Sequence, residues 1–408
     1  MRTLNFTIKA KTVESYLYGG YLFLLMDDGR ILYVSYRRLI HMLCEKYPQF
    51  DRLIKLAFLH NEYFKSKSVQ LILGIEELKD AVRKLWSRAA KEVSFEIDFD
   101  DIEEYCHSMG EWNSLPLDVY MYDLRMYVAS NEGVMESRLN PDFNDQYYRL
   151  RPTRFEKCFD SKVVSLSARA GKVVLSADRE GLFYGDALVE NARINISDHN
   201  NVPGRSLRTG WSDFDIINYE SARQFRYLTN DTANTDKLSS DRFRFGDKLE
   251  RKEIVNFATS AFDMSQMMEH SNIDKESIRF SFNSKGRSFF VMNDGSFINI
   301  RIKKVEGEPI QYSSVSRPLP QLSGAGMKTP LKAAVVPNGC VVEFFDKVML
   351  YQNNDVQLLE DTPVYGIRTY MGSRNYTDIV TVTKEDSVSF HSVDVFSTIN
   401  SARMFPHQ

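Results

Sequence analysis

The residues with the densest potential for chemistry in this chain are acidic. The segment SFEIDFDDIEEY carries six carboxylates within nine positions: Glu96, Asp98, Asp100, Asp101, Glu103 and Glu104. Clustered carboxylates bind Mg²⁺ or Ca²⁺, or divide the roles of general acid and general base. Three of them are the candidate metal ligands: Asp98, Asp100 and Asp101. The alternative is structural, because the acids alternate with Phe95, Ile97 and Phe99 as on the wet face of a half-buried strand. We favour that alternative and expect no metal and no cofactor.

A second candidate is the segment SDHNNVPGRSLRTGWSDFD, which places Arg205, Arg208 and Trp211 among turn residues. An exposed Trp beside Arg is typical of a hot spot for a protein partner or of a site that stacks bases. The alternative is a Trp packed against the next repeat, with the arginines in water.

A third candidate is the long Pro- and Gly-rich connection RPLPQLSGAGMKTPLKAAVVPNG, residues 317–339. Its GAGMKT is not a phosphate-binding loop, because Met327 separates Gly326 from Lys328. Loops of this length tend to be functional. We expect it to contact a partner through Arg317 and Lys328.

Linear signatures of enzymes are missing. The sequence contains no HExxH, GxSxG, dinucleotide fingerprint or zinc-ligand spacing, and its four Cys and seven His are scattered. The chain is therefore expected not to be an enzyme. The enzyme alternative is a hydrolase or lyase whose catalytic groups come from several repeats at one end of a central axis.

The elements that position these residues are indicated by a repeated corner. In FVMNDGSFINI, residues 290–300, two short strands flank an Asn-Asp-Gly turn, and Gly in such a turn supplies the positive φ that hairpins require. Clear three-strand copies surround Gly29, Gly181 and Gly295, and a weaker copy surrounds Gly133. In two further weak copies an Asp, at 355 or 386, replaces the Gly. One more copy is expected near FRYLTNDTANTDKL.

Residues 36–92 interrupt this pattern with a helical period. Ile75, Leu78, Val82, Leu85 and Ala89 fall on one face of an expected helix, and two further helices precede it. Twelve Lys or Arg and six Asp or Glu between positions 37 and 91 give this helical insertion a net charge of +6. Such a surface is typical of either a nucleic-acid contact or solvated amphipathic helices.

Meanders of this size resemble the β-propeller superfamily over nearly the whole chain except the helical insertion. The Trp-Asp ends of WD repeats and the double Gly of kelch repeats are missing, so the resemblance is one of architecture. It implies an all-β fold of roughly seven blades in a single domain, residues 1–408, with a helical insertion after the first blade. In closed propellers one terminus completes the blade of the other, so residues 4–10 are expected to pair with the last blade.

Composition narrows the function classes. A net charge of -3 gives no global attraction to nucleic acid or to an anionic membrane, and no apolar segment is long enough to span a bilayer. We expect a cytoplasmic scaffold or sensor subunit of a larger complex, which binds other protein subunits through loops and the helical insertion. Two alternatives remain: the propeller enzyme, and a nucleic-acid-binding accessory subunit.

Overall fold

A computed structural model shows how the repeats are built. It describes residues 3–60, 66–142, 149–169, 171–187, 196, 201–212, 215–230, 257–263, 267–269, 271–284, 287–303, 311–318, 329–337, 339–352, 355–373 and 375–393. The chain divides into two compact units. Unit 1 comprises Met1–Asn113, Pro152–Arg154 and Pro318–Gln408, and unit 2 comprises Ser114–Arg151 and Phe155–Arg317.

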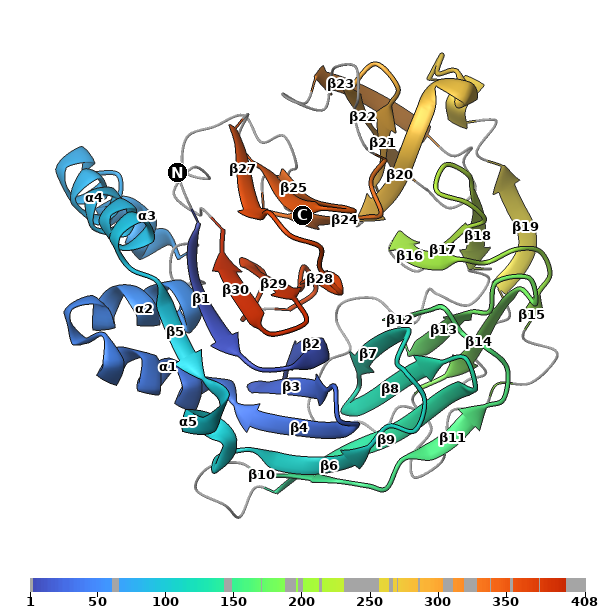
Figure 1. Ribbon diagram of the computed structural model, residues 1–408. Coiled ribbons are helices and arrows are strands. Elements are labelled where there is room, and N and C mark those ends of the chain that lie inside the picture. Colours follow the sequence, from blue (N-terminus) through green and yellow to red (C-terminus); the bar gives the residue numbers. More distant parts are fainter. Residues whose placement is uncertain are drawn as a thin grey trace. The chain divides into compact units, whose positions relative to one another are not determined.

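Unit 1 contains three antiparallel blades (Figure 1). The first consists of β2 (Thr12–Tyr18), β3 (Tyr21–Met26), β4 (Arg30–Ser35) and β6 (His107–Glu111). The second consists of β24 (Lys332–Val336), β25 (Gly339–Phe344), β26 (Lys347–Gln352) and β27 (Asp355–Glu360). The third consists of β28 (Gly366–Thr369), β29 (Ile379–Thr383), β30 (Val388–Ser392), β1 (Leu4–Lys9) and β5 (Phe95–Asp98).

Unit 2 contains four blades. The first consists of β7 (Asp118–Tyr122), β8 (Arg125–Ser130), β9 (Gly133–Asp142) and β10 (Arg149–Pro152), with β11 (Glu156–Phe159) also paired to β9. The next consists of β12 (Ser165–Arg169), β13 (Lys172–Ser176), β14 (Leu182–Asp186) and β15 (Asn201–Val202). The last two consist of β16 (Arg208–Ser212), β17 (Asp215–Tyr219), β18 (Phe225–Asn230) and β19 (Phe257–Asp263), and of β20 (Ile278–Ser284), β21 (Arg287–Met292), β22 (Ser296–Lys303) and β23 (Gln311–Pro318).

Seven small sheets of this kind make a seven-bladed β-propeller, as the sequence predicted. The expected copy near FRYLTNDTANTDKL is the blade that contains β18. Gly29, Gly133, Gly181 and Gly295 all have positive φ, which confirms why these corners need Gly. The two corners with Asp are different, because neither Asp355 nor Asp386 is among the residues with positive φ.

The N-terminal strand completes the last blade, as predicted. β1 pairs antiparallel with β30, with Leu4 opposite Ser392 and Ile8 opposite Val388. On its other side β1 pairs in parallel with β5. The free edge that β1 would otherwise present is therefore covered by a strand that follows the helices.

Helices occupy most of the segment between β4 and β5. They are α1 (Tyr36–Lys46), α2 (Asp51–Phe58), α3 (Lys67–Ile72) and α4 (Glu76–Glu92), followed after β5 by α5 (Phe99–Glu103). Ser35 and Ser66 cap α1 and α3, since their hydroxyls accept from the amides of Arg38 and Val69. The helices precede the fourth strand of the first blade, so they interrupt that blade instead of following it.

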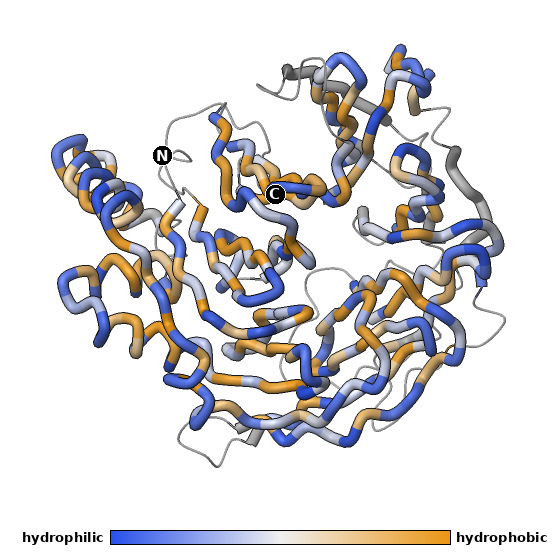
Figure 2. Tube along the Cα trace, in the orientation of Figure 1, coloured by the Kyte–Doolittle hydropathy of each residue, from blue (hydrophilic) through white to orange (hydrophobic). Residues whose placement is uncertain are grey.

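The blades are held together by apolar side chains between neighbouring sheets. In unit 1 one cluster joins β25 and β26 to β28, β29 and the residue after β30: Val341, Val348, Leu350, Ile367, Val380, Val382 and Val393. Figure 2 shows that hydrophobic residues concentrate in the strands and hydrophilic residues in the turns between them. None of the helices in the described part of the chain combines the length and the apolar composition needed to span a bilayer.

Candidate functional site

One end of unit 1 brings together turns from three blades. The first strands β2 and β28 run in the same direction, because Glu14 near the start of β2 binds Arg368 and Leu17 near its end binds Tyr370, which follows β28. The strand β24 begins at the same end, since Lys332 at its start and the paired Glu343 both interact electrostatically with Glu14. In each of the three blades the first residues of the first strand pair with the last residues of the second strand. The turn that follows each second strand therefore lies at the same end. We call this surface the loop face of unit 1: residues 11, 27–29, 331–332, 345–346, 361–365 and 384–387.

Three large apolar side chains are exposed on the loop face. Leu331 is 57% exposed, Phe345 is 74% exposed and Tyr365 is 57% exposed. The backbone fixes two of them, since the amide of Leu331 donates to the carbonyl of Glu343 at 2.8 Å and the amide of Tyr365 donates to that of Thr383 at 2.8 Å. They belong to two blades that pack directly on each other through the valine-rich cluster described above. Neighbouring exposed apolar residues are typical of an interaction surface.

Acidic side chains surround these apolar residues. Five acids of the loop face are exposed: Asp27, Asp28, Asp361, Glu385 and Asp386. The exposed bases on the same face are Lys11 and Lys332. One charge of each sign is already paired, since the Lys384 ammonium binds the Glu360 carboxylate at 3.0 Å and the Asp28 carboxylate binds Arg30 at 2.7 Å. The loop face therefore combines exposed apolar residues with more exposed acids than bases.

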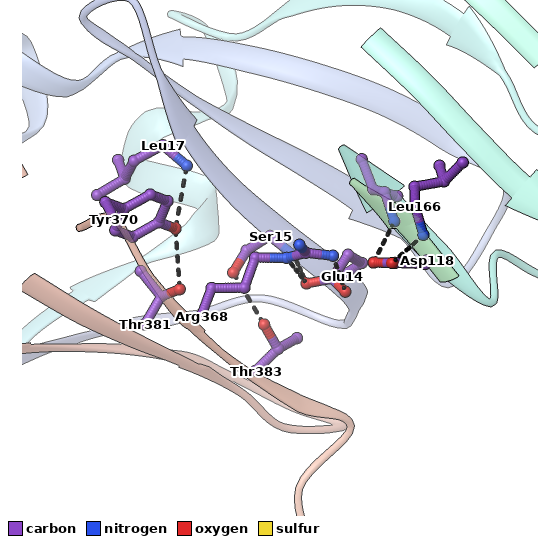
Figure 3. A network of polar contacts seen from close by, with 10 residues as sticks. Glu14, Ser15, Leu17, Asp118, Leu166, Arg368, Tyr370, Thr381 and Thr383 are labelled. Atoms are coloured by element: carbon purple, nitrogen blue, oxygen red, sulfur yellow. Dashed lines mark hydrogen bonds and ion pairs between the residues drawn. The ribbon is translucent and has the colours of Figure 1, made fainter. Parts of the chain in front are cut away.

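Beneath the loop face lies a network of polar side chains (Figure 3). The Arg368 guanidinium donates to both carboxylate oxygens of Glu14, at 3.1 and 2.8 Å, and lies 4.8 Å from the centre of the Tyr16 ring. Burial of Glu14 raises its pKa, but the charge and hydrogen bonds of Arg368 outweigh burial, so the pKa is lowered. Glu14 is a fixed anion and a weak base.

A second carboxyl in this region, that of Glu343, has its pKa shifted in the opposite direction. Glu343 pairs with Lys332 in the β24–β25 register and is 8% exposed. Burial raises the pKa of Glu343, although the charge of Lys332 opposes this effect. Its Oε2 atom has no hydrogen-bond partner among the residues that the structure describes. Two carboxyls with opposite pKa shifts are one feature of acid–base sites, but Glu14 is already bound by Arg368.

Other polar groups of the network bind one another across the blades. The Tyr370 hydroxyl accepts from the amide of Leu17 at 3.2 Å and lies 3.0 Å from the Thr381 hydroxyl. The hydroxyls of Ser15 and Thr383 are 2.8 Å apart (Figure 3). These contacts join β2 to β28 and β29 and stabilise the blade interface. Within unit 2, Asp118 accepts from the amide of Leu166 at 2.8 Å and joins β7 to β12.

The acidic segment is partly a strand, as the structural alternative predicted. Phe95 and Ile97 of β5 are buried, while Glu96 and Asp98 point to Lys9 on the paired strand, at 2.6 and 4.0 Å. The predicted alternation ends there, because Phe99 starts α5 and places Asp100 and Asp101 in its first turn, where the helix dipole favours acids. Glu103 binds Arg30 at 3.3 Å. Among the described residues, no group of three or more His, Cys, Asp or Glu is arranged to hold a metal ion.

Trp211 belongs to a strand and is buried. It lies in β16, is 8% exposed and donates from Nε1 to the Ser167 hydroxyl at 3.1 Å, on the neighbouring blade. Trp211 is therefore packed against the next repeat, which is one of the two alternatives from the sequence. The other alternative, an exposed Trp, is wrong. The expectation that both arginines lie in water is also wrong. Arg208 lies over the rings of Tyr219 and Phe280, at 4.0 and 4.6 Å, and burial lowers its pKa.

The remaining candidates are divided between the two units. Arg205 is exposed and binds Asp178 at 2.9 Å. Arg317 lies in β23, and Lys328 falls outside the described residues. Several bases of the helical insertion are also occupied: Lys55 by Asp51, Lys79 by Glu76 and Arg83 by Asp80. Partner binding by Arg205, Arg317 and Lys328 stays a prediction.

Sequence reasoning missed the exposed apolar residues of the loop face. Phe345 comes directly after Phe344, and the two cannot both face the same side of a sheet. A Phe-Phe pair followed by the turn residue Asp346 was the available signal. The exposure of Leu331 and Tyr365 depends on which loops meet at one end of unit 1, and the linear sequence does not specify that.

Comparisons with known proteins find no family and several solved structures of low similarity. No protein-family model matches the chain, and no curated protein sequence matches it. Among solved structures, BBS1N in complex with ARL6DN is similar, with 8% identity, a TM-score of 0.45 and coverage of 97% of this chain and 98% of that one. The computationally designed Ika8 protein has 9% identity, a TM-score of 0.42 and coverage of 96% and 100%. A putative 6-phosphogluconolactonase from Bacteroides uniformis has 10% identity, a TM-score of 0.41 and coverage of 68% and 81%. These similarities concern architecture alone.

Proposed function

We propose that this protein is a non-enzymatic interaction scaffold of an intracellular complex, and that it docks a protein partner on the loop face of unit 1. The observation that carries the proposal is the group of exposed apolar residues on two packed blades, Leu331, Phe345 and Tyr365. Closed blades give a rigid platform, so little ordering entropy is lost when a partner binds.

The charge of the loop face favours one kind of partner. Exposed acids outnumber exposed bases around the apolar residues, as described above. A partner segment that combines apolar or aromatic side chains with Lys or Arg complements this surface in both respects. Nucleic acid does not, because its phosphates would meet like charges.

The polar network beneath the loop face supports a structural role over a catalytic one. An axial enzyme would need carboxyls free to exchange protons with a substrate, whereas Glu14 is bound at both oxygens by Arg368. The hydroxyls of Ser15, Tyr370, Thr381 and Thr383 are likewise bound within the network. Their contacts connect neighbouring blades and make the platform stiff.

The proposal is tested by affinity capture of the tagged full chain from its native cells, with quantitative mass spectrometry. Phe345→Asp places a like charge in the acidic loop face and removes the most exposed apolar side chain of that face. The matched control is Leu358→Asp, where a side chain that is 50% exposed belongs to the strand β27 and not to the turns that form the loop face. We expect Phe345→Asp to lose at least one protein partner that Leu358→Asp retains.

Binding to the captured partner is then measured with purified components against salt concentration. Because the proposed contact pairs acids with bases, affinity should fall as ionic strength rises. Equal capture by both variants, or a partner without any basic segment at the contact, contradicts the proposal.

A further inference from the structure

Helices α3 and α4 carry a second exposed apolar surface, which the loop face does not include. Leu71 and Ile72 at the end of α3 are 78% and 53% exposed, and Ile75 and Leu78 at the start of α4 are 49% and 45% exposed. Figure 1 shows both helices at the outer edge of unit 1. Four large apolar side chains exposed within eight residues, over the end of α3 and the start of α4, exceed the scattered ones that any surface has.

The two halves of α4 have different environments. The second half is anchored, since Trp86 and Ala89 are both 0% exposed. The first half keeps Lys79 buried beside Glu76, at 3.0 Å, but leaves Leu78 and Ala81 exposed. Leu78, Ala81 and the half-buried Leu85 follow each other at helical spacing and form one stripe. A small residue in the middle of such a stripe allows another helix to approach closely.

Charge is also divided between the two halves of α4. The first half carries the acids Glu76, Glu77 and Asp80 beside the single base Lys79, and the second half carries the bases Arg83, Lys84, Arg88 and Lys91 beside the single acid Glu92. This order suits the dipole of the helix itself. It also makes the helix complementary to an antiparallel copy of itself, because each acidic half then meets a basic half.

We propose that α4 mediates self-association, with the α4 helices of two copies of this chain packed antiparallel about a two-fold axis near Asp80 and Ala81. Leu78 and Ala81 of the two copies then pack against each other near the axis, while Leu71, Ile72 and Ile75 of each copy lie toward the second half of the partner's α4. The same surface patch serves both copies, as a two-fold interface requires. A parallel arrangement would instead place acids on acids.

The antiparallel register makes a specific contact. Glu77 and Lys84 are seven residues apart, so they lie on the same flank of the stripe. A two-fold axis between positions 80 and 81 brings Glu77 of one copy to Lys84 of the other, twice per dimer. Both side chains are exposed, and neither takes part in an ion pair within the described part of the chain.

The test is analytical ultracentrifugation of the purified full chain over a range of concentrations. We expect a concentration-dependent dimer. Leu78→Asp, Glu77→Lys and Lys84→Glu should each raise the dissociation constant at least about tenfold, because each places an unmatched or like charge in the interface. The double variant Glu77→Lys with Lys84→Glu should restore the wild-type constant, since every contact is attractive again.

Leu358→Asp is the matched control for an exposed Leu elsewhere in unit 1, and circular dichroism checks that each variant remains folded. A wild-type chain that stays monomeric at all concentrations overturns the proposal. A dimer that Leu78→Asp leaves unchanged overturns it as well, and a charge-swapped double variant as weak as the singles overturns the antiparallel register. None of these outcomes depends on the partner at the loop face.

Discussion

Glu360, the last residue of β27, lies beside the Lys384 ammonium and the His391 imidazole. Its carboxylate binds the Lys384 ammonium at 3.0 Å, and Nε2 of His391 lies 3.6 Å away. Burial alone would raise the pKa of Glu360, but the approach of His391 and Lys384 outweighs burial and lowers it from 4.5 to about 2. The contacts join β27 to the next blade, so this carboxylate stabilises a blade interface.

The lowered pKa predicts how stability depends on pH. A carboxyl whose pKa is lower in the folded state stabilises the protein above its unfolded pKa, and this contribution is lost as pH falls from about 4.5 to about 2. Glu360→Gln should reduce the free energy of unfolding at pH 7 by about 2 kcal/mol. The difference should shrink as pH falls below 4.5, because wild type loses the contribution that the variant lacks.

Urea denaturation at a series of pH values measures this difference. Glu385→Gln, at an exposed position of the same loop face, is the control and should have little effect. A difference between wild type and Glu360→Gln that is the same at pH 3 and pH 7 would refute the assignment.

Two residues that were candidates for partner binding because of their type, Trp211 and Arg208, have structural contacts instead. Trp211 and Arg208 were assigned to a binding loop because of turn residues around them, but alternate positions of β16 decide their environment. Trp211 reaches Ser167 on the next blade, and Arg208 reaches the rings of Tyr219 and Phe280. A linear sequence does not reveal which neighbour offers a hydroxyl or a ring.

At the scale of elements, Gly133 shows that a turn residue can determine how closely two strands of a blade approach each other. Its φ is +126°, and a Cβ atom there would lie 2.0 Å from the Phe159 carbonyl oxygen on β11. Gly20, in the turn between β2 and β3, also has positive φ, at +92°, but apart from its chain neighbours no atom of the described residues lies within 4 Å of its Cβ position. A side chain would therefore meet only backbone strain at Gly20, whereas at Gly133 it would meet backbone strain and a steric clash.

Alanine substitution should therefore affect the two turns differently. Gly20→Ala should lower the free energy of unfolding by about 1–2 kcal/mol, because the only cost there is the left-handed backbone conformation. Gly133→Ala also has to separate β9 from β11, so we expect at least about 2 kcal/mol more. Denaturant unfolding of both variants checks this order, and equal losses would contradict it.

The helical period predicted α4 correctly, but not which part of it is buried. Ile75 and Leu78 share the apolar face with Ala89, yet the first two are exposed and the last is buried. Periodicity identifies a face that needs a partner, and it does not say whether that partner belongs to the same chain. Likewise, alternation predicted β5 but ran on into α5, because Asp100 and Asp101 fit the start of a helix as well as the wet face of a strand.

At the scale of the whole molecule, Phe6 joins both ends of the chain to the helices. Its ring stacks on Phe390 of β30, with centroids 4.5 Å apart, and meets Phe58 of α2 edge-on at 4.9 Å. Tyr36 of α1 lies 6.4 Å away. The side chain is fully buried. The closing strand and the helices therefore share one aromatic core.

Phe6→Ala should reduce the free energy of unfolding by about 3–5 kcal/mol, the range for removing a buried Phe. Phe6→Leu, which keeps most of the apolar volume, should cost roughly 1 kcal/mol. Calorimetry of the two variants measures both losses. Equal, small losses would show that β1 does not hold the last blade.

The sequence predicted the blades and their closure because glycine corners and alternating strands are local signals. It did not predict that the fourth strand of the first blade follows the helices, since β6, HSMGE, has little apolar alternation. It also did not predict the loop face, whose residues are distant in sequence. Leu331 and Tyr365 meet at one end only because β24 and β28 begin there.

Docking on the loop face is tested most directly by site-specific photo-crosslinking in the native cells. A photoreactive phenylalanine analogue replaces Phe345 in the full chain, and the same analogue replaces Leu358 as the control. We expect position 345 to form an adduct with a defined protein through a segment rich in apolar and basic residues, while position 358 does not. No adduct at 345, or the same adducts at both positions, would contradict the account.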